Sequence, residues 1–130
     1  MNVTRTGLGV VFAAAFTTGC MARVVPATAV MASLRSEHAR IASTDSSTPV
    51  SILATPDVYV LTGLTHDQVL LGLGEPEGCP RNDRGKCEGV GEWLYMFHKL
   101  PPGSRGGGAE LHLLFGADQR CRSAEWQFTQ

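Results

Sequence analysis

The chain has 130 residues, of which 43% are hydrophobic, and its acidic and basic side chains nearly balance at a formal net charge of −1. This balance provides neither a basic field that would hold nucleic acid nor an acidic tail. Once the N-terminal leader described next is removed, about 110 residues remain, which is enough for one small domain with one core but not for two.

The N-terminus has the pattern of a secretory signal. An apolar run over residues 8–16 is followed by small residues and then by Gly19 and Cys20. The run is too short to cross a bilayer, which needs about 20 apolar residues. We therefore expect residues 1–19 to be a cleaved signal peptide and Cys20 to be the acylated first residue of an exported lipoprotein. The alternative is ordinary cleavage, for example after Ala22 or Ala29, which leaves a soluble periplasmic protein.

Residues 20–50 are rich in Ala, Ser and Thr, with a proline near each end. This composition is typical of a flexible tether, and we interpret the segment as a spacer from the membrane. The alternative is an amphipathic helix over residues 28–42, because Val30, Leu34 and Ile41 stand at near-helical spacing.

A folded domain is predicted over residues 51–130. Pro56 and Asp57 indicate a first short helix that ends before Gly63. Thr65 and Gln68 form a capping-box pattern at the start of a second helix of about two turns. Gly74 and then Pro76 end this helix, because glycine accepts a positive φ and proline does not continue a helix.

Three strands follow in the predicted domain. Residues 92–100 alternate, with Trp93, Tyr95 and Phe97 on the side that we expect to face the helices. Residues 110–115 alternate likewise after a glycine-rich hairpin tip, and residues 120–128 form the third strand, in which Cys121 reaches the core side only if a bulge intervenes. The prediction is an α+β fold in which two short helices pack on a three-stranded antiparallel β-meander, in the order ααβββ.

The helix and first-strand motifs resemble those of the SmpA/OmlA family of small outer-membrane lipoproteins, which includes the BamE subunit of the β-barrel assembly machinery. The family pattern G-x-T-x-x-x-V-x-x-x-L-G-x-P falls on residues 63–76, and its W-x-Y-x-F strand falls on residues 93–97. A further L-x-L-x-F strand falls on residues 111–115. The resemblance covers roughly residues 63–128 and implies a scaffold or assembly-factor subunit of the outer membrane that binds other envelope proteins.

The cysteines predict a disulfide, because thiols of exported chains tend to be oxidised. We favour the pair Cys79 and Cys87, which staples a charged loop that has little apolar content, and with Cys20 acylated one of the remaining three cysteines stays unpaired. The rival is Cys121 paired with Cys79 or Cys87. The spacing is wrong for a redox CxxC site, so thiol catalysis is not expected.

No catalytic residue, metal or cofactor is predicted. A hairpin register that set His98 opposite His112, with Glu125 near them, would offer three zinc ligands. Polar residues on the solvated face of a sheet are the ordinary explanation, and no close-spaced ligand pair supports a metal.

These patterns predict a non-catalytic, lipid-anchored protein of the outer membrane, facing the periplasm. Its envelope partner is expected to contact exposed loops, at Arg81 and Arg84 and at Gly106, Gly107 and Gly108. The alternative is an exported inhibitor of an envelope or secreted hydrolase, since β-lactamase inhibitory proteins resemble the same ααβββ unit in tandem.

Overall fold

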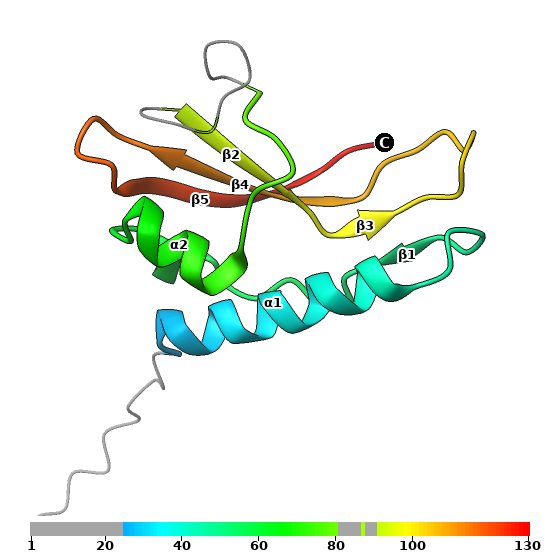
Figure 1. The fold of residues 1–130 in the computed structure, drawn as a ribbon, viewed down its shortest axis with the longest axis horizontal. Helices are drawn as coiled ribbons and strands as arrows, with labels where there is room; N and C mark the ends of the chain where they lie inside the picture. Colours follow the sequence, from blue (N-terminus) through cyan, green and yellow to red (C-terminus); the bar gives the residue numbers. More distant parts are fainter. Residues whose placement is uncertain (1–24, 81–86, 88–90) are drawn as a thin grey trace, which may run out of the picture.

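The computed structural model describes residues 25–80, 87 and 91–130 of the chain. In chain order the elements are α1 (Ala27–Ser43), β1 (Val50–Ser51), the 3-10 helix η1 (Tyr59–Leu61), α2 (His66–Leu73), β2 (Gly91–Met96), β3 (His98–Lys99), β4 (Ala109–Phe115) and β5 (Cys121–Phe128). Figure 1 shows α1 and α2 on the same side of the main sheet. The predicted α+β fold is confirmed.

The main sheet has the strand order β2-β4-β5, with both pairs antiparallel. Alternate residues of these strands face the helices and form the core, because side chains of a strand point to opposite faces in turn. The largest side chains with almost no exposed surface are Tyr95, Phe97, Phe115, Leu34, Leu61, Leu111, Leu113 and Val69. The expectation that Trp93, Tyr95 and Phe97 face the helices is therefore confirmed.

The first helix differs from the tether that the sequence composition suggested. Residues 27–43 form the 17-residue helix α1, which buries Val30, Met31, Leu34 and Ile41. These side chains recur at helical spacing, so burying them on one stripe compensates for a segment that otherwise lacks helix signals. The tether interpretation is thus wrong for residues 27–43, and the alternative of an amphipathic helix is the one observed.

Helix α2 begins and ends at the predicted residues. The Thr65 side chain accepts the Gln68 amide N–H, and the Gln68 side chain accepts the Thr65 N–H at 2.9 Å. At the other end Gly74 has a φ of 83° and donates its N–H to the Leu70 carbonyl. Its ψ of −168° is not that of the left-handed helix, and this combination of angles is essentially restricted to glycine. The short helix expected before Gly63 is the single 3-10 turn η1.

Helices α1 and α2 approach closely at one glycine. A Cβ atom on Gly72 would lie 2.4 Å from the Met31 sulfur, so no larger side chain fits there without displacing Met31. The small residue thus allows the close approach of the two helices.

The strand predicted over residues 92–100 is divided between two sheets. Phe97 donates its N–H to the carbonyl of Ala109, the first residue of β4, and its own carbonyl accepts the N–H of Ile52, just after β1. β2 therefore ends at Met96, and β3 pairs with β1 in a separate two-stranded sheet. Alternation alone did not reveal this division, because Phe97 stays on the core side across it.

A bulge in β5 brings Cys121 to the core side. Leu114 pairs with Ser123, while Phe115 pairs with Cys121, so Arg122 is an extra residue on β5. Cys121 is buried as a result. The sequence predicted that Cys121 would reach the core side only with such a bulge, and the bulge is present.

Candidate partner-binding surface

The predicted site residues fall into two groups with respect to the structure. Cys20, Arg81 and Arg84 lie outside the described residues. The paired cysteines and the glycines at 106–108 lie within them, so the structure bears on these positions directly.

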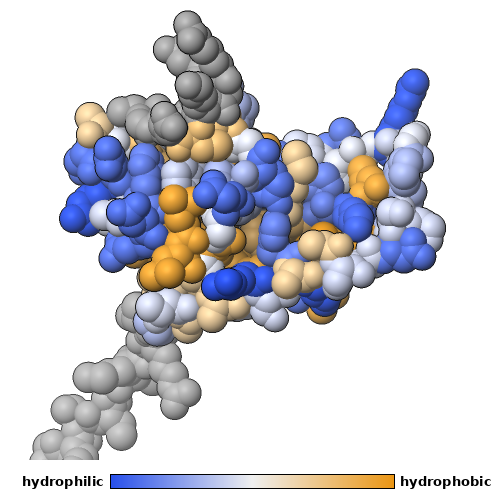
Figure 2. Space-filling view, in the orientation of Figure 1, coloured by the Kyte–Doolittle hydropathy of each residue, from blue (hydrophilic) through white to orange (hydrophobic). Residues whose placement is uncertain are grey.

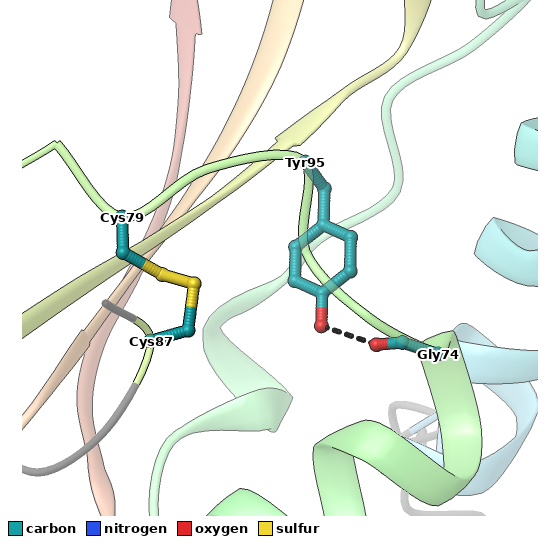
Figure 3. The surroundings of a disulfide bond; sticks show 4 residues. All are labelled: Gly74, Cys79, Cys87 and Tyr95. Carbon is teal, nitrogen blue, oxygen red and sulfur yellow. Dashed lines mark hydrogen bonds between the residues drawn. A yellow bond between two sulfur atoms is a disulfide. The ribbon is translucent and has the colours of Figure 1, made fainter. Parts of the chain in front are cut away.

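A disulfide joins Cys79 to Cys87, the favoured pairing, with the two Cα atoms 5.3 Å apart. Cys79 belongs to the hydrophobic core and is only 3% exposed. The bridge thus joins the two ends of the segment that contains Arg81 and Arg84 to each other and, through Cys79, to the core. Figure 3 shows the bridge beside Tyr95.

The chain just before this bridge is also fixed to the edge of β2. Glu77 donates its N–H to the Leu94 carbonyl, and Leu94 donates its N–H to the Gly78 carbonyl. The Glu77 carboxylate contacts His38 of α1 and accepts the Met96 N–H. The base of the loop is therefore held by backbone pairing, by a side-chain contact to α1 and by the disulfide.

Tyr95 joins this part of the sheet to the end of α2. Its hydroxyl donates a 2.8 Å hydrogen bond to the Gly74 carbonyl, drawn as a dashed line in Figure 3. Burial raises the pKa of Tyr95, and the carboxylates of Glu77 and Glu75 raise it further. The hydroxyl therefore stays protonated and remains a donor.

Of the glycines at 106–108, Gly106 lies in the exposed hairpin tip, whereas Gly107 and Gly108 pack against neighbouring chain. A Cβ on Gly107 would lie 2.1 Å from the Thr129 hydroxyl oxygen, and one on Gly108 would lie 2.4 Å from the His98 Cβ. The Gly108 carbonyl also accepts the Thr129 N–H. Gly107 and Gly108 are thus packing positions, because only glycine fits so close to neighbouring chain. The exposed part of the tip is residues 102–106.

The sheet face opposite the helices carries a compact polar cluster. His112 contacts Glu92 through Nδ1, and its Nε2 lies 3.1 Å from Glu110 Oε2. His98 Nε2 lies 3.6 Å from the other oxygen of Glu110. All four side chains are largely buried. His112 therefore lies within hydrogen-bond reach of both carboxylates, whereas both ring nitrogens of His98 are buried without a hydrogen-bond partner in the described part of the chain.

The register differs from the one that a zinc site would have required. Leu94 lies opposite His112 on β2, while His98 lies opposite Ser51 in the small sheet. Glu125 does lie opposite His112 on β5. Within the described part of the chain, no group of three or more His, Cys, Asp or Glu residues is arranged to hold a metal ion.

The third cysteine of the domain, Cys121, is a free buried thiol. It donates to the Ser123 carbonyl at 3.3 Å, and burial raises its pKa to about 11. A thiol with such a pKa is protonated at neutral pH, so Cys121 is a poor nucleophile.

His66 was not singled out from the sequence, yet it lies in the aromatic part of the core. Its ring stacks on Trp93 at a centroid distance of 4.6 Å and meets the edge of Phe115 at 4.2 Å. Burial lowers the pKa of His66, although Asp67 opposes this shift. Its partners lie far along the chain, so no local pattern indicated this contact.

Comparison of the chain with protein-family models, with curated proteins and with solved structures found no match. Among the described helices, none combines the length and the apolar character that crossing a bilayer requires. The resemblance to the SmpA/OmlA lipoproteins therefore stands on the sequence motifs alone and stays a prediction.

Proposed function

We propose that this protein is an outer-membrane lipoprotein, anchored through Cys20, that binds an envelope protein as a non-catalytic scaffold or assembly-factor subunit. The observation that carries the proposal is where the domain places the start of α1 and the disulfide. Helix α1 begins on one side of the domain, and the chain that follows α2 runs away from it, past the sheet, toward the disulfide (Figure 1). The start of α1 thus adjoins the proposed anchor, and the disulfide that closes the loop lies away from it.

The position of α1 supports cleavage before Cys20 over cleavage after Ala29. The helix begins at Ala27, and the N–H groups of Ala29 and Val30 donate to the Pro26 carbonyl. Cleavage after Ala29 would remove this first turn and leave the buried Val30 as a charged N-terminus. Removing a helix start and placing a charge on a buried residue both destabilise a small domain.

The disulfide supports export. Disulfides persist in the periplasm and other oxidising compartments and are rare in reducing ones. A bridge between Cys79 and Cys87 therefore agrees with a leader over residues 1–19.

The loop closed by this bridge is the partner-binding surface that we favour. Its charged residues Arg81 and Arg84 lie in sequence between the two bridged cysteines, so a partner that binds them engages a segment whose ends are already joined. The aromatic face of the sheet is covered by the helices and belongs to the core. Contact through the loop leaves that core undisturbed.

Co-purification from detergent-solubilised envelopes tests this proposal. The variant Arg81→Glu/Arg84→Glu should keep the thermal unfolding temperature of the wild type and recover several-fold less of the partner. Arg122→Glu is the control, because it reverses the charge of an exposed arginine on β5. Deletion of residues 106–108 is not a suitable test, since Gly107 and Gly108 are packed.

Two outcomes would overturn the proposal. Equal recovery by both charge variants would exclude the loop as the contact surface. If the wild type recovers no partner and instead inhibits an envelope hydrolase, the protein is an inhibitor rather than a scaffold.

A further inference from the structure

A groove of about 410 Å³ lies between the first half of α1 and helix α2 with the residue Leu64 before it. Met31 and Arg35 line it from α1, and Leu71 and Gly72 line it from α2. Among the described residues that line the groove, Arg35 is the one that carries a charge, and its guanidinium donates to the Leu71 carbonyl at 3.5 Å. The groove is therefore mostly apolar, with a single cationic group at its edge.

Large apolar side chains stand exposed beside this groove. Leu71 is 82% exposed, and Val25, just before α1, is 53% exposed. Figure 2 shows hydrophobic side chains gathered on the surface over α2. We call this region, made of Val25, Met31, Arg35 and Leu71, the α1–α2 surface.

The length of chain before α1 places this surface near the anchor. Six residues separate Cys20 from Ala27, so the seven steps between their Cα atoms span at most about 25 Å. Helix α1 is itself about 26 Å long, because its 17 residues each rise about 1.5 Å. If Cys20 is acylated, the N-terminal end of α1 therefore has to stay close to the membrane, whereas the C-terminal end of α1 does not.

We propose that the α1–α2 surface rests on the same membrane that holds the acyl chains of Cys20. Leu71 and Val25 enter the boundary between headgroups and acyl chains, and Arg35 binds lipid phosphate. A guanidinium pairs with phosphate through two parallel hydrogen bonds, and one bond to the Leu71 carbonyl leaves other N–H groups free to do so. A second contact of this kind reinforces a lipid anchor and fixes the orientation of the domain. This inference rests on the proposed anchor at Cys20.

A fluorescent label at one of two positions tests the contact. Leu71→Cys and Leu53→Cys form a matched pair, because Leu71 is 82% and Leu53 is 81% exposed. Leu53 lies near the other end of α1, where its N–H donates to Glu37. Each variant also carries Cys121→Ala, so that the bimane label attaches at one site, and circular dichroism confirms that both fold.

The acylated full-length proteins are reconstituted in vesicles of phosphatidylethanolamine and phosphatidylglycerol, with and without doxyl-labelled lipid. We expect doxyl lipid to quench the label at position 71 several-fold more than the label at position 53. Adding Arg35→Glu should reduce that difference.

The outcomes separate the inference from the proposed anchor. Protein that floats with the vesicles but shows equal quenching at the two positions keeps the anchor and overturns the α1–α2 contact. A label at position 71 that responds only to added envelope protein also overturns it, in favour of a protein occupant. Protein that does not float overturns the anchor, and the inference with it.

Discussion

The hydroxyl of Tyr95 is a polar link between the sheet and the end of α2. Its hydrogen bond satisfies the Gly74 carbonyl at a helix end, where backbone acceptors need a partner. Tyr95→Phe should lower the free energy of unfolding by about 1 to 3 kcal/mol, because it leaves this acceptor without its donor. Tyr59→Phe, at a largely exposed ring, should have almost no effect. Urea unfolding checks both, and equal stability of the two variants would contradict the role of the bond.

His66 should make the stability of the domain depend on pH. Burial lowers its pKa below the ordinary value of 6.5, so the unfolded chain binds the proton more tightly than the folded chain. The contribution of neutral His66 to the stability of the folded domain is complete above about pH 6.5. It is lost as the pH falls through that value toward the lower pKa of His66 in the folded chain.

His66→Phe should therefore flatten the fall in unfolding free energy between about pH 7.5 and about pH 5.5. Phenylalanine keeps a ring between Trp93 and Phe115 but does not titrate. Denaturation series at several pH values measure the two slopes. Identical slopes in the wild type and the variant would show that His66 does not contribute.

The sequence revealed residue-level contacts only where they are local. Thr65 and Gln68 are three positions apart, so their capping box follows from helix geometry. His66 meets Trp93 and Phe115 only after the sheet has formed, and no spacing rule links them. The same holds for Glu92 and His112, which a strand register brings together.

At the scale of elements, α1 depends on tertiary packing rather than on its own signals. Pro26 provides no side-chain cap at the start of α1, and the composition of this segment is that of a linker. Four buried side chains nevertheless hold it against the domain. Composition describes what a segment prefers alone, and here burial of an apolar stripe overrides that preference.

Leu34→Ala should consequently unfold or strongly destabilise the domain. Leu34 has no exposed surface, and truncating a buried leucine costs about 3 to 5 kcal/mol through lost burial and the cavity left behind. The neighbouring Ser33→Ala, at an exposed position, should change stability by less than about 0.5 kcal/mol. Chemical denaturation of both variants tests this, and a small effect of Leu34→Ala would return residues 27–43 to the role of a spacer.

For the whole molecule, the α+β architecture was predictable because the second helix and the three strands carry local signals in a consecutive order. Helix α1 was predicted only as an alternative to a tether, since its apolar stripe is sparse, and the helix predicted after Pro56 is the single 3-10 turn η1. The disulfide also followed from the sequence, because only one of the possible pairs encloses a short charged loop. The division between β2 and β3 and the packing of Gly107 and Gly108 did not, because both depend on chain segments that are distant in sequence.

Identifying the first residue of the exported protein tests the central proposal most directly. Intact-mass spectrometry of the protein extracted from membranes should show Cys20 as the N-terminus, carrying acyl chains. The Cys20→Ser variant should instead appear in the soluble periplasmic fraction with its domain folded, because Cys20 is not among the buried residues of the described core. An unmodified N-terminus at Arg23 or Val30 in the wild type would contradict the lipid anchor and the outer-membrane role that depends on it.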